Sequence, residues 1–132
     1  MVMDIVFDFD GVLCKYEGWR GHDNIGKPIT VMIELVKKLH AKGHHLKLCT
    51  TRLNPYPFGQ NKKADDSVQS GYALETITEW LYNNKVVSCF EEITGYKPFG
   101  DIYIDDRAIR FENPKQLHGD LEKYVKRMEG KG

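Results

Sequence analysis

The sequence predicts an α/β fold, in which a central parallel sheet is covered by helices on both faces. Short apolar runs of strand length alternate along the chain with longer stretches of helical periodicity, which is the pattern of this fold class. A helical stretch of about fifteen residues separates the first two runs, and a connection of that length joins parallel strands by a right-handed crossover. Strands in such sheets are buried on both faces.

Composition indicates one ordinary globular domain, residues 1–132, with 41% apolar and 29% charged residues. Nineteen basic side chains balance nineteen acidic ones, which argues against a general affinity for nucleic acid or for anionic membranes. The opening residues have neither a basic leader nor a long apolar stretch, so we expect a cytoplasmic protein without a membrane span. The three cysteines do not match the spacing of metal ligands and are assigned no chemical role.

The first half of the chain predicts two strands joined by a helix. Residues 3–8 form the first strand, and a helix begins at Pro28, a favourable residue for a first turn. Gly43 ends this helix, and residues 45–50 form the second strand. The apolar residues at helical spacing are Ile29, Met32, Ile33, Val36 and Leu39.

The second half predicts a helix, two strands and a final helix. Asp65 or Asp66 caps the first of these helices after a Pro-rich loop, and the helix ends near residues 83–84. Residues 89–93 and 101–105 are the strand candidates. The apolar side of the first helix is formed by Val68, Tyr72, Ile77, Trp80 and Leu81.

The final helix begins at Asn113 and Pro114. Its apolar residues recur at helical spacing, so we expect one side of the helix to face the core. These inward residues are Leu117, Leu121, Tyr124, Val125 and Met128.

The stretch IVFDFDGV, residues 5–12, has two interpretations. Its alternation suits an exposed hairpin strand that ends in an Asp-Gly turn. The parallel crossover instead favours a buried strand that carries Asp8 at its carboxyl end and Asp10 just beyond it. Ligands of open parallel sheets bind at this edge, so we expect polar residues from other strand ends to converge there. They are Thr50, Thr51, Arg52, Lys97, Asp105, Asp106 and Arg107.

Crowded carboxylates at one sheet edge predict a bound cation. Without one, repulsion raises the pKa of at least one of the acids. Mg²⁺ prefers oxygen ligands and is commonly held by one or two carboxylates together with a substrate phosphate. Asp8, a backbone carbonyl near Asp10, and one of Asp105 or Asp106 would suffice. Gly11 fits this arrangement because the chain must turn sharply there, with a positive φ.

Four elements of the sequence, in this order, resemble the motifs of the haloacid dehalogenase superfamily. They are DFDGV at residues 8–12, a strand that ends in Thr50, Lys97 ahead of an acidic pair, and YIDD at residues 103–106. The resemblance implies a three-layer Rossmann-like fold. The intact second aspartate of the DxDG element resembles the phosphatase branch, and implies Mg²⁺-dependent hydrolysis of a phosphate monoester.

The resemblance also assigns roles to the matched residues. It implies that Asp8 is the nucleophile that becomes an aspartyl phosphate, and that Asp10 is the general acid and base. Thr50 would bond a phosphoryl oxygen, and Lys97 would balance the charge of the transferring group. The implied metal ligands are Asp8, Asp10, Asp105 and Asp106, and the further substrate-binding residues are Gly11, Thr51 and Arg52. Arg52 and Arg107 could each reach the substrate, but we expect an ion pair within the site as their main role.

The sequence has no room for the cap domain that many members of this superfamily carry. Only residues 14–27 and 53–64 could overhang the site, which suits a large or protruding phosphate ester, or an oligomer whose neighbour supplies a lid. Tyr16, Trp19 and His22 lie in the first of these segments and either select substrate or pack locally. The shared motifs touch only the phosphoryl group and the metal, so they do not specify the alcohol.

Three other functions fit parts of the pattern. One is a phosphate-binding or metal-binding protein with weak or no turnover. A second is a two-component receiver domain, but its acidic pair comes early and its lysine late, the opposite of the order here. A third is a phosphatase of nucleic-acid ends, with Arg52, Lys62 and Lys63 on the backbone, which the zero net charge does not support.

Overall fold

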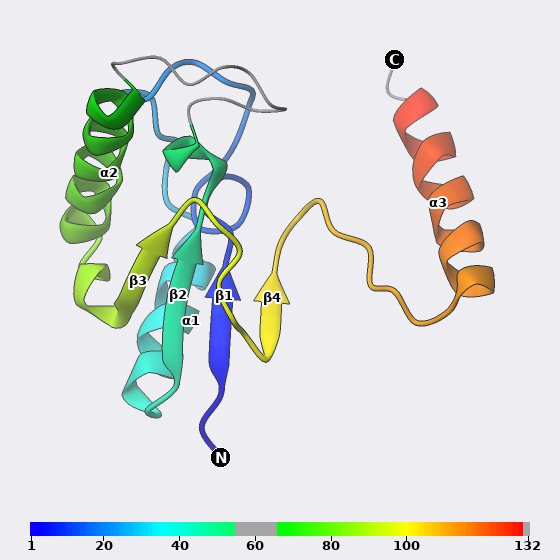
Figure 1. Cartoon of the computed structure of the whole chain (residues 1–132), viewed down its shortest axis with the longest axis horizontal. Helices are drawn as coiled ribbons and strands as arrows, with labels where there is room; N and C mark the ends of the chain where they lie inside the picture. Colours follow the sequence, from blue (N-terminus) through cyan, green and yellow to red (C-terminus); the bar gives the residue numbers. More distant parts are fainter. Residues whose placement is uncertain (55–65, 131–132) are drawn as a thin grey trace.

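The computed structural model describes residues 1–54 and 66–130. Its four strands are β1 (Asp4–Phe7), β2 (His45–Cys49), β3 (Phe90–Thr94) and β4 (Ile102–Ile104). They form one sheet in the order β3-β2-β1-β4, and every neighbouring pair is parallel (Figure 1). β1 lies between β2 and β4, which confirms the parallel, interior strand and excludes the hairpin.

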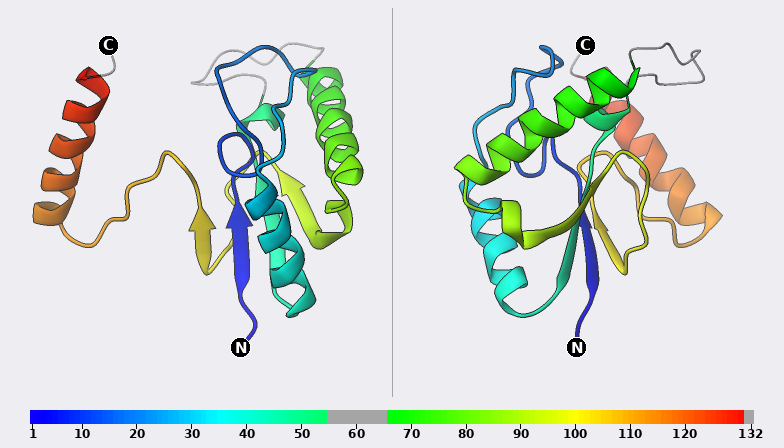
Figure 2. Two further views of the ribbon diagram at one scale, coloured as in Figure 1. Left: turned by 180° about the vertical axis from the view of Figure 1, so that it is seen from behind. Right: turned by 60° about the vertical axis from the view of Figure 1, so that its left-hand side comes forward.

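Three α-helices flank the sheet: α1 (Thr30–Ala41), α2 (Asp66–Asn83) and α3 (Pro114–Glu129). The described residues also form two short 3-10 helices. η1 (Thr51–Leu53) follows β2, and η3 (Val87–Cys89) precedes β3. α1 and α2 cover one face of the sheet, and α3 stands beyond the β4 edge, apart from the sheet (Figure 2). The predicted α/β fold, a Rossmann-like three-layer arrangement without a cap domain, is confirmed.

The main core lies between the sheet and the two helices α1 and α2. Because side chains alternate along a strand, every second residue of β1 and β2 points to this face. Each large apolar side chain buried there contributes about 1.5–3 kcal/mol relative to an exposed one. The core includes Ile5, Phe7, Phe9, Ile33, Val36, Leu46, Leu48, Ile77 and Leu81.

The opposite face of the sheet is crossed by the segment between β3 and β4. The Lys47 ammonium donates a hydrogen bond to the Phe99 carbonyl, 2.9 Å away, and so ties this segment to β2. A Cβ placed on Gly100 would lie 2.5 Å from Cγ2 of Val6, so only glycine allows the segment to pass this close to β1.

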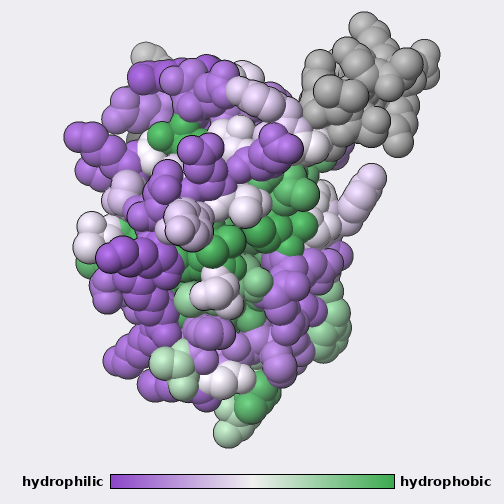
Figure 3. All heavy atoms as spheres, turned by 90° about the vertical axis from the view of Figure 1, so that its left-hand side faces the viewer, coloured by the Kyte–Doolittle hydropathy of each residue, from purple (hydrophilic) through white to green (hydrophobic). Residues whose placement is uncertain are grey.

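The surface is mostly hydrophilic when viewed from the side of α2, with a hydrophobic area near its centre (Figure 3). Within the described part of the chain, no helix is both long enough and apolar enough to cross a membrane.

α1 begins two residues later than the predicted start at Pro28. Pro28 instead forms an isolated antiparallel bridge with Cys14, which holds the segment before the helix against the residues that follow β1. α2 also differs from expectation, because Tyr72 is 46% exposed and bonds Asp23 rather than entering the core. Trp80 does pack on the core, with its ring edge-on to Phe9 at a centroid distance of 5.1 Å.

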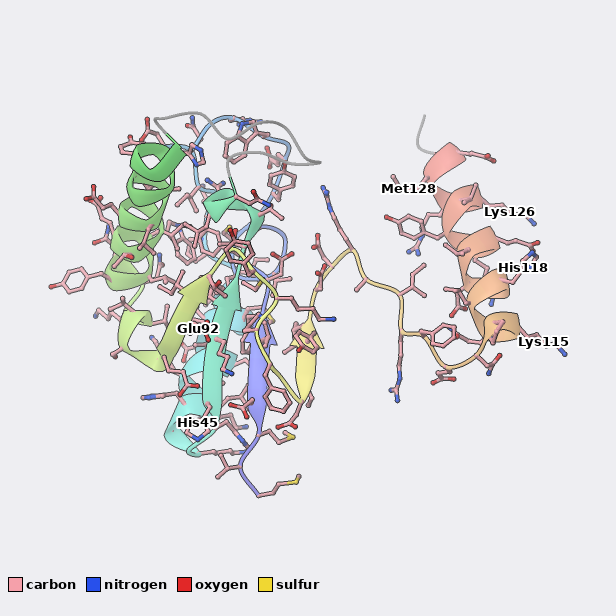
Figure 4. The ribbon with its side chains drawn as sticks, in the orientation of Figure 1. His45, Glu92, Lys115, His118, Lys126 and Met128 are labelled. Carbon is pink, nitrogen blue, oxygen red and sulfur yellow. The ribbon has the colours of Figure 1, made fainter. Side chains whose placement is uncertain are left out.

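The prediction that the apolar side of α3 faces the core is wrong in this structure. The helix begins at Asn113 and Pro114 as predicted, and Asn113 caps it in a reciprocal pair with Gln116, but α3 buries none of its residues. Its side chains, including Met128, stand clear of the strands (Figure 4). Periodicity shows which side of a helix is apolar, but it does not determine how the preceding segment places that helix. Four of the residues that were predicted to point inward are instead 37% to 50% exposed: Leu121, Tyr124, Val125 and Met128.

Candidate functional site

Three acids converge where β1 and β4 end. Phe7 and Ile104 are partners in the parallel register, so the residues that follow them, Asp8 and Asp105, leave the sheet side by side. The Asp8 N–H continues the ladder by donating to the Ile104 carbonyl at 2.9 Å. One carboxylate oxygen from each of Asp8, Asp105 and Asp106 lies within 4.8 Å of the other two. The structure thus brings together three of the four acids predicted as metal ligands, whereas the fourth, Asp10, pairs with Arg52.

Asp8 is partly buried and also lies close to the other two acids of the cluster. Its pKa is raised to about 7, first because burial disfavours the charged carboxylate and then because Asp105 and Asp106 repel it. A hydrogen bond from the Phe9 N–H to the Asp8 carboxylate, 2.8 Å long, acts in the opposite direction. The expected rise in pKa is confirmed.

The donor set of this cluster suits a small divalent cation. All three groups are carboxylates, which are the hard oxygen ligands that Mg²⁺ prefers. A cation among them would also offset both the burial and the repulsion that raise the pKa of Asp8.

Gly11 makes the approach of Asp106 possible. Its φ is +83°, the left-handed region that favours glycine, so the expected positive φ is confirmed. A Cβ at this position would also overlap the Asp106 carboxylate. Gly11 is therefore required both by the turn after Asp10 and by the packing of the acidic cluster.

Asp10 lies beside this cluster and is held by Arg52. Nε of Arg52 donates to one Asp10 oxygen at 2.7 Å, and Nη2 donates to the other at 2.9 Å. The Arg52 side chain is only 4% exposed, so the pair is largely shielded from water. Its position follows from η1, in which Thr50 caps the turn by accepting a hydrogen bond from the Arg52 N–H. The expected ion pair of Arg52 is confirmed.

Residues 14–28, which we call the flap, are tied to the site by the same guanidinium. Arg52 also donates to the backbone carbonyls of His22, at 3.4 Å, and Asn24, at 3.1 Å. The Trp19 ring lies over the guanidinium, 5.0 Å from its carbon to the ring centroid. One buried side chain thus orients the Asp10 carboxylate and anchors the flap above it.

Arg107 reaches the flap from the other side of the site. Its guanidinium carbon lies 5.7 Å from the centroid of the Tyr16 ring. Its expected ion pair is absent among the described residues. The second predicted overhang, residues 53–64, falls mostly outside the described ranges, as do Lys62 and Lys63.

The other predicted site residues are Thr50, Thr51 and Lys97, and they are less closely associated with the acidic cluster. Thr50 is buried at the end of β2, and its hydroxyl oxygen accepts the bond from Arg52, while Thr51 is exposed. Lys97 is also exposed, and its ammonium lies 4.7 Å from the centroid of the Tyr103 ring. In the described part of the chain, no ion pair joins Lys97 to the acidic cluster. An aromatic face on β4 attracts the ammonium instead.

Two cysteines lie near the site, although their spacing in the sequence indicated no chemical role. The buried Cys14 thiol lies 3.7 Å from an Asp10 oxygen as a donor. Burial, followed by the Asp10 charge, raises the pKa of Cys14 to about 12, so the thiol stays neutral. Burial and the charges of Asp8 and Asp105 also raise the pKa of Cys49. The only sequence signal for Cys14 is its place four residues after Asp10, in a chain that turns back at Gly11.

His45 lies at the end of the sheet opposite the acids. His45 begins β2 and contacts Glu91 at 3.0 Å, far from the strand ends that carry the acids (Figure 4).

Comparison with known proteins supports the fold alone. No family model matches the chain, and no curated protein matches it. A solved structure, described as a conserved protein coded by a locus of Bacteroides thetaiotaomicron, aligns with a TM-score of 0.55 at 19% sequence identity. The alignment covers 94% of this chain and 93% of that one, so the two share an architecture over nearly their whole length.

Proposed function

We propose that this protein is a Mg²⁺-dependent phosphatase that hydrolyses a phosphate monoester through an aspartyl-phosphate intermediate. The convergence of Asp8, Asp105 and Asp106 at adjacent strand ends is the observation that carries the proposal. The resemblance of the four sequence motifs to the haloacid dehalogenase superfamily supports the same reaction.

Asp8, Asp105 and Asp106 would hold the metal. The ion would supply positive charge against both the acids and the phosphoryl oxygens, which is the kind of stabilisation that phosphoryl transfer requires.

In the first half of the reaction, a carboxylate oxygen of Asp8 forms a bond to phosphorus as the bond to the alcohol oxygen breaks. Asp10 gives its proton to that leaving oxygen, and the alcohol departs. In the second half, Asp10 takes a proton from water, whose oxygen attacks the phosphorus. The bond to Asp8 breaks, and both inorganic phosphate and the Asp8 carboxylate are released.

Arg52 supports the role of Asp10 through geometry. A planar guanidinium bonded to both oxygens fixes the orientation of the carboxyl group. Oδ1 of Asp10 also accepts from the Cys14 thiol, so Oδ2 is the oxygen that keeps a second lone pair for a proton or a water. Thr50, at the end of β2, is proposed to donate its hydroxyl hydrogen to a phosphoryl oxygen. Lys97 needs a different rotamer to reach the acids, because its ammonium lies over Tyr103.

Hydrolysis of 4-nitrophenyl phosphate and of a panel of natural phosphate monoesters tests this proposal. We expect turnover that requires Mg²⁺, stops with a chelator, and is lost in Asp8→Asn. A protein that binds Mg²⁺ and inorganic phosphate but hydrolyses no ester in the panel is instead the binding protein considered above. Turnover that persists in Asp8→Asn also contradicts the proposal.

A further inference from the structure

A cavity of about 410 Å³ opens between the flap and the candidate site. Its lining includes both members of the buried pair, Asp10 and Arg52, and residues from both arms of the flap. In the proposed reaction, Asp10 is the group next to the leaving oxygen. The cavity is therefore in the position to receive the alcohol part of the substrate.

The charges that line this cavity do not cancel. Two acids line the cavity, and each pairs with an arginine. Asp10 forms the buried pair with Arg52, and Glu17 forms an exposed pair with Arg20 over 3.4 Å. Lys15 and Lys27 complete the charged lining. No acid of the described residues lies within ion-pair distance of either lysine. The cavity therefore has an excess of two positive charges, both on the flap.

The backbone holds these two lysines directly opposite each other. Cys14 and Pro28 form an antiparallel bridge, and the next pair along is Lys15 and Lys27. The Lys15 N–H donates to the Lys27 carbonyl at 2.9 Å. Like charges at directly opposed positions destabilise an antiparallel pair. An anion bound between the two ammonium groups would remove this repulsion.

The flap is fixed in place, so the cavity exists before any ligand enters. Arg52 bonds two flap carbonyls, as described above, and the Trp80 indole N–H of α2 donates to the Gly26 carbonyl at 3.2 Å. A preformed cavity loses little conformational freedom when it binds a ligand, which favours selection among small substrates.

We propose that Lys15 and Lys27 bind a second anionic group on the alcohol part of the substrate. The substrate class is then a small phosphate monoester that also carries a carboxylate or a second phosphate. This inference rests on the proposed phosphatase function and deepens it. The limited volume and the zero net charge of the chain favour a small molecule over a nucleic-acid end.

Matched substrates test the inference. We would measure kcat/KM for alkanediol bisphosphates, for ω-carboxyalkyl phosphates and for neutral alkyl phosphates, each with two to about six carbons between the groups. We expect at least one doubly charged series to exceed the neutral series by about tenfold or more, since a charge-assisted contact to two lysines contributes that much. The two charged series distinguish carboxylate from phosphate.

Lys15→Met and Lys27→Met should reduce this preference toward unity, mainly through a higher KM for the charged esters. Lys38→Met removes a lysine from the exposed side of α1 and should keep the preference. Thermal melts check folding, and we expect Lys15→Met to be at least as stable as the wild type because the repulsion is gone.

Three results would overturn the inference, and they differ from failure of the function itself. One is Asp8-dependent hydrolysis with equal kcat/KM for charged and neutral esters. The second is loss of the preference in Lys38→Met to the same extent as in the two flap variants. The third is a higher kcat/KM for a 5′-phosphorylated oligonucleotide than for any small ester. Absence of Asp8-dependent hydrolysis of every ester contradicts the phosphatase and, with it, the inference.

Discussion

The guanidinium of Arg52 donates one hydrogen bond to each oxygen of the Asp10 carboxylate, over 2.7 Å and 2.9 Å. The same group donates to two carbonyls of the flap. The orientation of the proposed acid and the position of the flap therefore depend on the same side chain, which is almost fully buried. A change at Arg52 should affect both.

Arg52→Lys keeps the positive charge but loses the planar pair of donors. We expect kcat on a phosphate monoester to fall by about tenfold or more, because Asp10 is no longer held in one orientation. Two part-buried hydrogen bonds to flap carbonyls are also lost, so the free energy of unfolding should fall by about 1–3 kcal/mol. Steady-state kinetics and urea unfolding measure the two effects.

Arg110→Lys is the matched control, since Arg110 forms an exposed pair with Glu112 and neither residue lines the cavity. An exposed pair contributes about 0–1 kcal/mol, so its loss should be barely measurable. If Arg52→Lys keeps full kcat, Arg52 does not position Asp10 for catalysis.

The raised pKa of Asp8 predicts that Mg²⁺ binding depends on pH. Mg²⁺ requires the carboxylate, so its affinity should rise by up to about tenfold per pH unit toward pH 7, and then level off. Calorimetric titration with Mg²⁺ from about pH 5 to about pH 8.5, a range that spans this pKa, measures the dependence. A Mg²⁺ affinity independent of pH below 7 contradicts this assignment.

Stability without Mg²⁺ should show the opposite trend. The folded protein keeps the Asp8 proton up to a pH of about 7, while the unfolded chain releases it near the ordinary pKa of 3.8. Asp8 therefore makes the metal-free protein less stable as the pH rises through this window. Asp8→Asn removes this contribution, so the fall in melting temperature between pH 4 and pH 7 should be smaller than in the wild type.

Gly11→Ala should be more damaging than the same change at Gly43. Both glycines have positive φ, +83° and +90°, so both changes carry a left-handed backbone cost of about 1–2 kcal/mol. Only at Gly11 does the new methyl group meet the Asp106 carboxylate, whereas nothing lies within 4 Å at Gly43. We expect the Gly11 variant alone to lose Mg²⁺ affinity, measured by the Mg²⁺-dependent shift in melting temperature. Equal effects of the two changes would show that the cluster is not packed on Gly11.

Leucines on α2 and α3 should differ sharply in their contribution to stability. Leu81 is fully buried, so Leu81→Ala should cost about 2–5 kcal/mol. Leu121 is 44% exposed on a helix that buries no residue, so Leu121→Ala should cost less than about 0.5 kcal/mol. Chemical unfolding of both variants measures the difference. A large loss in Leu121→Ala means that α3 packs on another surface in solution.

Local patterns in the sequence determined the secondary structure and the strand ends. Alternation of short apolar runs with a helical period specified the parallel order, and Asp-Gly after the first strand specified the left-handed turn at Gly11. These features depend on interactions within a few residues, such as steric limits on φ and the burial of one side of an element.

Only the tertiary structure decided which of these residues meet. Asp10 and Arg52 are 42 positions apart, and their contact depends on β1 and β2 being neighbours in register. The same register explains the cluster of Asp8 with the β4 acids, while Lys97 is drawn to Tyr103 instead. α3 formed as its periodicity predicts, yet its apolar side remains exposed. Strand order, register and connecting segments set these distances, and no local pattern encodes them.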